Sequence, residues 1–125
     1  MTETEEQTKA YDLAERTARF GEAIIDFLKK VQLGPMTNRM VDQLAGASTS
    51  VGANYREADD ASSKKGFRNS ISICKREARE AKFFIRIIVR AVPELKEDAK
   101  PLWQEARELH LIFAKIHRSQ GSEGK

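Results

Sequence analysis

The sequence of 125 residues is poor in cysteine, proline and glycine. It contains one cysteine, three prolines and seven glycines. A single cysteine excludes a disulfide within the chain, which suits a reducing compartment, so we expect a cytoplasmic protein. With so few prolines and glycines, no segment has the composition of a low-complexity linker. A chain of this length is expected to form one domain around a single core.

Long hydrophobic runs are missing as well. The most apolar stretch, Phe83–Val89, is interrupted by Arg86, whereas a membrane-spanning helix needs about 18 or more consecutive apolar residues. Residues 1–8 are acidic and polar, which is not the pattern of a secretory signal peptide. We therefore expect no association with a membrane, and a flexible segment at residues 1–8.

Apolar residues instead recur at intervals of three and four along almost the whole chain. This period predicts four helices, at about 9–32, 36–61, 64–92 and 99–118. Turn and cap signals separate them, namely Gly34-Pro35, Ser62-Ser63, Pro93 and Pro101. Helices of this length with short turns favour an all-α fold, an antiparallel up-down-up-down four-helix bundle over residues 9–118. Residues 119–125 are expected to form a disordered tail.

Positive charge is concentrated in the third predicted helix. Residues 64–90 contain nine basic and two acidic residues, a net charge of +7, whereas the rest of the chain carries −4. At about 100° per residue, seven of the cations fall within about 40° of Arg68 and span about 33 Å. This basic stripe consists of Lys64, Arg68, Lys75, Arg79, Lys82, Arg86 and Arg90. It is either a surface for an anionic partner or a solvated face with ion pairs to neighbouring acids.

The other side of the same predicted helix is apolar over an arc of about 200°, wider than the roughly 100° needed to cover one neighbour. We expect it to contact two neighbours in the bundle, or one neighbour and another subunit. Glu77 and Glu80 fall inside this arc, and a buried carboxylate without a partner is costly. We therefore predict a structural polar network, with Arg16 as the counter-ion, that comprises Arg16, Gln43, Ser50, Asn54, Glu57, Glu77 and Glu80.

Two glycines lie inside the second predicted helix. Gly46 and Gly52 each cost about 1 kcal/mol relative to alanine in a helix interior. A close approach of another backbone would compensate this cost. We expect such an approach at both positions, within the bundle or between chains.

Several separated motifs resemble one bacterial family. The runs S-T-S-V-G-A-N-x-x-E-A at Ser48–Ala58, S-K-K-x-F at Ser63–Phe67 and E-A-x-E at Glu77–Glu80 are similar to those of proteins encoded in 23S rRNA intervening sequences. The resemblance covers residues 11–118, nearly the whole predicted bundle. After Glu80 the family usually has a Trp-Leu pair, where this chain has Phe83–Ile85. The replacement is apolar for apolar, so it casts little doubt on the fold.

The resemblance implies an antiparallel four-helix bundle that assembles as a homopentamer. It also implies kinship with the accessory variability protein of diversity-generating retroelements, a basic pentamer that binds nucleic acid and the reverse transcriptase. No defined activity comes with the family itself. Asn54, Glu57, Glu77 and Glu80 are motif positions, and the cations of the third helix are the implied contact surface.

Nucleic-acid binding through the basic stripe is the leading functional hypothesis. Phosphates attract lysine and arginine regardless of base sequence, and an oligomer would multiply a modest stripe by mass action. The stripe contains no aromatic residue, so we expect recognition of backbone or shape rather than base stacking. The alternative is a scaffold or accessory subunit that binds proteins only. In that case Tyr55 and Trp103 are interface anchors, or they lie at a partly buried bundle edge.

An enzymatic function has the least support. Di-iron sites in four-helix bundles need Glu-x-x-His pairs, but Arg107 and Ala114 stand three positions before His110 and His117. Those histidines are expected at the surface or an interface. Cys74 falls on the apolar side of its helix and is expected to be a core residue, not a nucleophile. We therefore expect no enzyme activity, metal, cofactor or small-molecule substrate.

Overall fold

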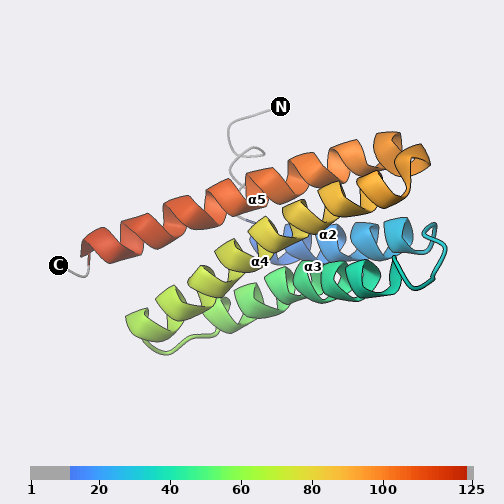
Figure 1. The fold of residues 1–125 in the computed structure, drawn as a ribbon. Helices are drawn as coiled ribbons and strands as arrows, with labels where there is room; N and C mark the ends of the chain where they lie inside the picture. The colour runs from blue at the N-terminus through green and yellow to red at the C-terminus, as the bar shows by residue number, and fades with distance from the viewer. Residues whose placement is uncertain (1–11, 124–125) are drawn as a thin grey trace.

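The computed structural model of the chain describes residues 12–123, which form four α-helices and one short 3₁₀ helix. Successive α-helices run in opposite directions (Figure 1). This arrangement confirms the predicted all-α, up-down-up-down four-helix bundle. The elements are α2 (Leu13–Leu28), α3 (Asn38–Asp59), α4 (Lys64–Ala91), η1 (Pro93–Leu95) and α5 (Lys96–Glu123).

The four helices differ in length. Helices α4 and α5 have 28 residues each, whereas α2 has 16, which corresponds to about 42 Å and about 24 Å. Helix α4 packs along both α3 and α5, while α2 packs mainly on α3 and only weakly on α5. The start of α4 and the end of α5 therefore project beyond α2 (Figure 1). The long α4–α5 pair presents a continuous surface.

The core consists of the apolar positions that the helical period identified. Each α-helix contributes one row of residues that are buried, with at most 5 % of their surface exposed. Thr17 is the polar member of the α2 row, and its hydroxyl donates to the backbone oxygen of Leu13 at 2.6 Å. The rows contain Leu13, Thr17, Phe20, Ile24 and Phe27; Leu44, Ala47, Val51 and Ala58; Ile71, Cys74, Ala78, Ala81, Ile85 and Ile88; and Ala106, Leu109 and Phe113.

The connection between α2 and α3 is longer than predicted. Helix α2 ends at Leu28 rather than near residue 32, because the amides of Lys30 and Val31 bond to oxygens three residues back, as in a 3₁₀ turn. Val31 is still buried at 5 % exposure, so its apolar spacing mimicked one more helical turn. Gly34 does not adopt a positive φ and therefore does not form the left-handed helix stop that the Gly-Pro pair suggested.

The last helix is longer than predicted at both ends. It begins at Lys96 rather than residue 99, and Pro101 lies inside it rather than at a break. It also continues to Glu123, so residues 119–123 belong to the helix and not to a disordered tail. The predicted flexible residues 1–8, and residues 124–125, lie outside the described part of the chain.

The two glycines of α3 have different surroundings. A β-carbon built on Gly52 would lie 3.3 Å from Thr17 Oγ1 on α2, so the predicted close approach is confirmed there. A β-carbon on Gly46 would meet nothing within 4 Å among the described residues of the chain, so the approach does not occur there within the bundle, and an approach between chains stays a prediction. Within the bundle, close packing compensates the flexibility of Gly52.

Alanine at these two positions should therefore have different effects. Gly46→Ala is expected to raise the free energy of unfolding by about 1 kcal/mol, because it restricts the unfolded chain and clashes with nothing. Gly52→Ala should gain less or lose stability, because the methyl group must displace Thr17. Urea unfolding at equal protein concentration measures both. An equal gain at both positions would contradict the close α2–α3 contact.

Candidate functional site

The basic stripe lies on the flank of α4 that faces α5. The buried residues of α4 cluster about 250° around the helix from Arg68, so the core is not diametrically opposite the stripe. Five stripe residues are exposed, while Lys75 and Lys82 are half-buried beside α5. The stripe thus follows the junction of the two longest helices.

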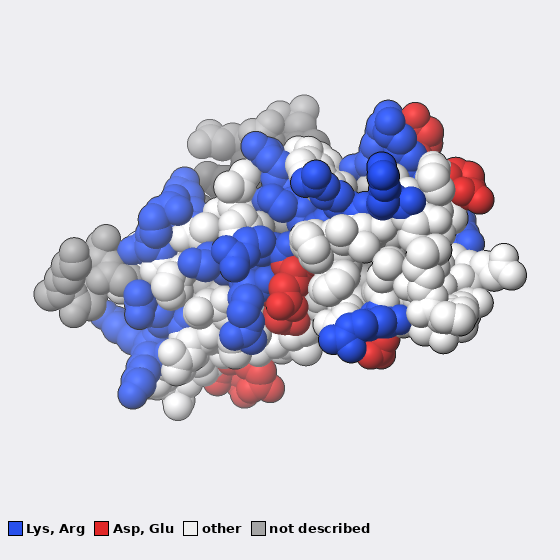
Figure 2. Space-filling model, viewed as in Figure 1, with Lys and Arg blue, Asp and Glu red and all other residues white. Residues whose placement is uncertain are grey.

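The stripe cations have no acidic partners in the part of the chain that the structure describes. All ion pairs found among residues 12–123 involve other cations, such as Arg16, Lys30 and Lys100. The predicted alternative, a solvated face neutralised by acids on adjacent helices, does not occur there. On the face formed by α4 and α5, basic side chains outnumber acidic ones (Figure 2). Within residues 12–123, the positive charge of this surface is therefore not neutralised by ion pairs of the stripe.

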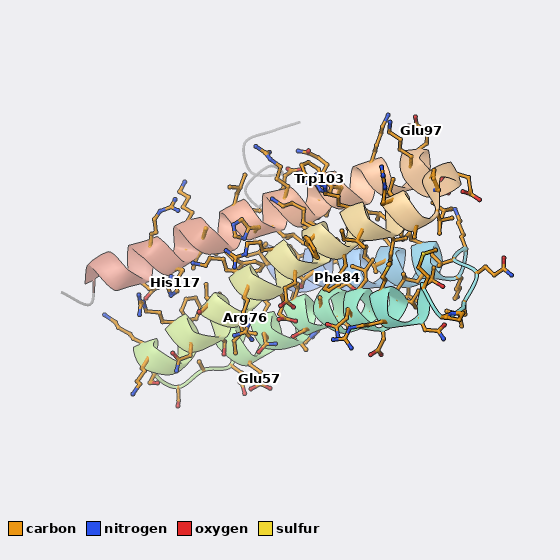
Figure 3. The ribbon with its side chains drawn as sticks, viewed as in Figure 1. Glu57, Arg76, Phe84, Glu97, Trp103 and His117 are labelled. Carbon is orange, nitrogen blue, oxygen red and sulfur yellow. The ribbon has the colours of Figure 1, made fainter. Side chains whose placement is uncertain are left out.

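Three ring side chains of α5 run beside the stripe. Trp103, His110 and His117 are spaced seven residues apart and fall within about 40° of one another around the helix. The ammonium of Lys82 lies 5.5 Å from the centroid of the Trp103 ring, a cation–π distance. His110 Nδ1 lies 3.1 Å from the backbone oxygen of Lys75, so this nitrogen donates. Figure 3 shows Trp103 and His117 on α5.

This juxtaposition was not predicted from the sequence. The stripe on α4 contains no aromatic residue, and the rings come from the neighbouring helix. The seven-residue spacing of the three rings was the available signal. This spacing indicates a shared site only once α5 is known to pack against the stripe side of α4.

Helix α5 also adds cations to the same surface. Four exposed basic residues fall within about 60° of Trp103 around α5. Lys100 pairs with Glu97 at 3.0 Å; ion pairs of the other three are absent among the described residues. These four cations are Lys96, Lys100, Arg107 and Arg118. Two rows of positive charge therefore border the α4–α5 junction.

The imidazole of His117 responds to these charges. Burial lowers the pKa of His117, and the nearby cations Arg68 and Lys75 lower it further. The ring is therefore neutral at pH 7. The start of the stripe and the end of α5 thus lie close enough for their charges to act on the same imidazole.

The predicted polar network does not form. Glu80 and Glu57 are exposed, and Glu77 is half-buried with its carboxylate 3.5 Å from the guanidinium of its neighbour Arg76. Because the core of α4 is rotated away from the direction assumed, Glu80 falls on the solvent side. Apolar residues on the outer flank of α4, such as the exposed Phe83, had widened the apolar arc and misplaced its centre.

Of the remaining members, Arg16 pairs outside the predicted network, whereas Asn54 and Ser50 bond to each other. Arg16 forms a two-pronged pair with Glu105 of α5 at 2.7 and 2.8 Å, not with Glu77 or Glu80, and this bonding raises its pKa. Asn54 donates to the side chain of Ser50 at 2.9 Å within α3. Gln43 is half-buried. Arg16 thus links α2 to α5, a pair that packs less extensively than α2–α3, α3–α4 or α4–α5.

The outer flank of α4 also carries an apolar strip. Phe83 is 55 % exposed, and its ring meets that of Phe84 edge-on with centroids 5.3 Å apart. Ile87 lies one turn further along and is half-buried. Phe83 and Ile87 are thus less buried than the core row of α4, which packs between α3 and α5. The strip corresponds to the surplus part of the apolar arc that the sequence indicated.

Comparison with known sequences decides the family. The profile of the family described as "23S rRNA-intervening sequence protein" matches residues 6–115. The chain belongs to this family. The matched range contains α2, α3 and α4 and most of α5. The basic stripe, Trp103, His110 and the Arg16–Glu105 pair therefore belong to the family region, whereas His117 lies just beyond it. Among curated proteins, none matches the sequence.

One solved structure is similar to this family member over most of its length. It is a protein of unknown function from the S23 ribosomal protein family of Bacteroides thetaiotaomicron. The alignment covers 88 % of this chain and 98 % of that chain, with 23 % sequence identity and a TM-score of 0.74. At this identity the similarity supports the fold.

Two further properties concern the described residues as a whole. Within residues 12–123, no helix combines the length and apolarity needed to cross a membrane. The same residues contain no group of three or more histidine, cysteine, aspartate or glutamate side chains placed to hold a metal ion.

Proposed function

We propose that this intervening-sequence family protein is a non-enzymatic, cytoplasmic nucleic-acid-binding protein that contacts RNA or DNA through the α4–α5 surface. The observation that supports the proposal most is the lack of acidic partners for the basic stripe within the described chain. Unpaired lysine and arginine release counter-ions when they meet phosphates, which provides affinity independent of base sequence. Affinity should therefore fall steeply with salt.

The proposal includes self-assembly into a homopentamer. The pentamer was implied by the family resemblance, and the exposed apolar strip around Phe83 is a suitable contact for another copy of the chain. Several stripes on one assembly would bind a long polyanion far more tightly than one stripe does. Each copy would then need only modest affinity.

Charge reversal within the stripe tests the proposal. The variant R79E/K82E/R86E should bind RNA and DNA about 100-fold more weakly in a low-salt mobility shift, because it removes three phosphate partners and adds repulsion. The matched control is K29E/R39E/R56E, which reverses three exposed cations away from the stripe and reaches the same net charge. Only the stripe variant should lose binding.

Light scattering of both variants and the unchanged protein separates contact from assembly. If the stripe variant keeps the size of the parent protein, its loss of binding reflects lost phosphate contacts. Equal binding by the two variants would sink the nucleic-acid proposal. The scaffold alternative would then predict protein partners that are retained after nuclease treatment.

A further inference from the structure

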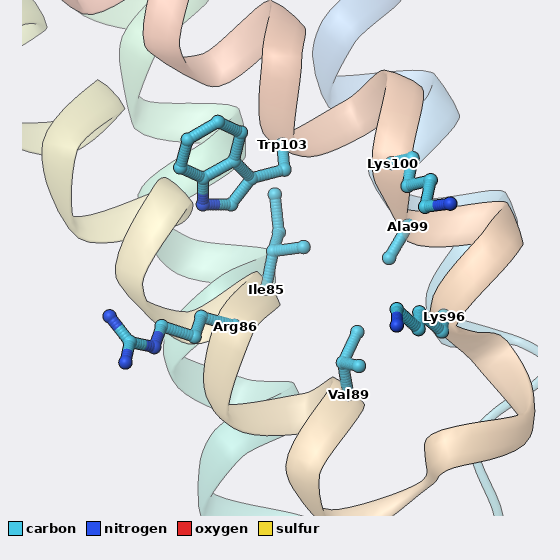
Figure 4. A pocket seen from close by; sticks show the side chains of 7 residues that line it. All are labelled: Ile85, Arg86, Val89, Lys96, Ala99, Lys100 and Trp103. Carbon is cyan, nitrogen blue, oxygen red and sulfur yellow. The ribbon is translucent and has the colours of Figure 1, made fainter.

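A groove between α4 and α5 combines an apolar floor with cations at its edges. Its volume is about 170 Å³. Figure 4 shows Arg86 on one side of it and Lys96 and Lys100 on the other, with Trp103 at one end. No carboxylate lines it among the described residues. The lining residues are Ile85, Arg86, Val89, Lys96, Ala99, Lys100 and Trp103.

Trp103 is the most unusual member of this groove. Its side chain is 37 % exposed, although a tryptophan is one of the largest apolar side chains and is usually mostly buried. The nearby Lys82 ammonium, 5.5 Å from the ring centroid, adds positive charge beside the indole. The groove thus offers a partly exposed aromatic side chain with several cations near it.

We propose that the groove receives an unpaired base of a single-stranded nucleic acid. The base packs against the indole of Trp103 and the apolar floor, while the flanking phosphates pair with Arg86 and Lys96; Lys100, which pairs with Glu97, adds positive charge nearby. This inference rests on the proposed function and deepens it, because it names single strands rather than duplexes as the preferred partner. Bases in a duplex are stacked on one another and cannot enter the groove.

The composition of the groove favours this occupant. A single strand presents flat, largely apolar rings at regular intervals between negative charges, and aromatic side chains flanked by cations are the usual means of binding it. Arg86 belongs to both the groove and the basic stripe, so a strand seated here continues along the stripe toward His110 and His117. An acidic peptide would satisfy the cations but supplies no ring beside each charge.

The single tryptophan of the chain reports on the groove directly. At low salt, a 20-residue oligothymidylate should quench the Trp103 fluorescence, and a 20-base-pair blunt duplex should not. Trp103→Ala should weaken oligothymidylate binding about tenfold or more, the effect of losing one stacked base, and change duplex binding by less than twofold. Trp103→Phe should retain most of the affinity. Leu111→Ala, at another exposed apolar position of α5, is the matched control.

The outcomes distinguish this inference from the proposed function. If the protein binds both probes but Trp103→Ala and Trp103→Phe bind like the parent, the base site is wrong and backbone binding stands. If neither probe binds, both proposals fall. Displacement of the oligothymidylate by a polyglutamate peptide of equal charge, with the same quenching, would also overturn the base site. Circular dichroism of each variant verifies the fold.

Discussion

Replacing Phe113 by alanine should lower the free energy of unfolding by about 3–5 kcal/mol. Phe113 is completely buried and has the largest volume among the fully buried side chains of the described residues. Its ring packs at a 45° tilt against Tyr55 of α3, with the centroids 6.0 Å apart. Truncation removes the apolar transfer energy of the ring and leaves a cavity that surrounding helices fill only in part. The loss is a large share of the roughly 5–15 kcal/mol by which domains are stable.

The measurement is urea unfolding followed by circular dichroism. It is made at one fixed protein concentration, because the proposed self-assembly would contribute to stability. Leu111→Ala is the control, since Leu111 lies two positions away on the same helix and is 49 % exposed. It should change the free energy of unfolding by less than about 0.5 kcal/mol. Similar values for the two variants would show that α5 does not close the core as described.

The helical period predicted the fold because it depends on burial within each helix. Phe20, Ile24 and Phe27 of α2, and Ile85 and Ile88 of α4, follow one another at three or four residues and are all buried. N-cap residues also predicted helix starts. The side chain of Ser63 accepts a hydrogen bond from the amide of Gly66 at 3.0 Å and caps the start of α4. Such signals lie within one helical turn, so no tertiary information is needed to interpret them.

Helix ends were less predictable because apolar spacing and hydrogen bonding diverge there. Val31 keeps the apolar rhythm of α2 after the backbone has left the α-helix. Pro101 would end most helices, yet here it lies in the second turn of α5. Apolar spacing therefore identifies buried residues more reliably than it identifies the residue at which a helix ends.

The candidate site needed information that a single helix does not contain. The angular positions of the stripe cations followed from α4 alone, but the direction of the core did not, and this error placed Glu80 inside the bundle. The ring row of Trp103, His110 and His117 belongs to α5, and its relation to Lys75 and Lys82 depends on how α4 and α5 pack. The site is therefore a property of a helix pair.

In the folded protein at pH 8, Cys74 should react with a thiol reagent such as DTNB at least 100-fold more slowly than in guanidinium. Burial raises the pKa of the Cys74 thiol to about 12, and the sulfur lies 3.4 Å from the backbone oxygen of Val51, to which it donates. The reactive thiolate is therefore about 1,000-fold scarcer than in an ordinary cysteine. The side chain is also fully buried, so the reagent cannot reach it without local opening.

Because the chain has one cysteine, the absorbance change belongs to this residue alone. A Cys74→Ala/Asn69→Cys variant is the control, since residue 69 is exposed on the same helix and its thiol should react as fast in the folded as in the unfolded protein. The raised pKa also makes the free energy of unfolding depend on pH. The neutral thiol contributes its full stabilisation below its ordinary pKa near 9, and this stabilisation is lost as the pH rises toward 12. Rapid labelling of the folded protein at pH 8 would mean that α3 and α4 separate readily. The core between these two helices would then not be packed as described.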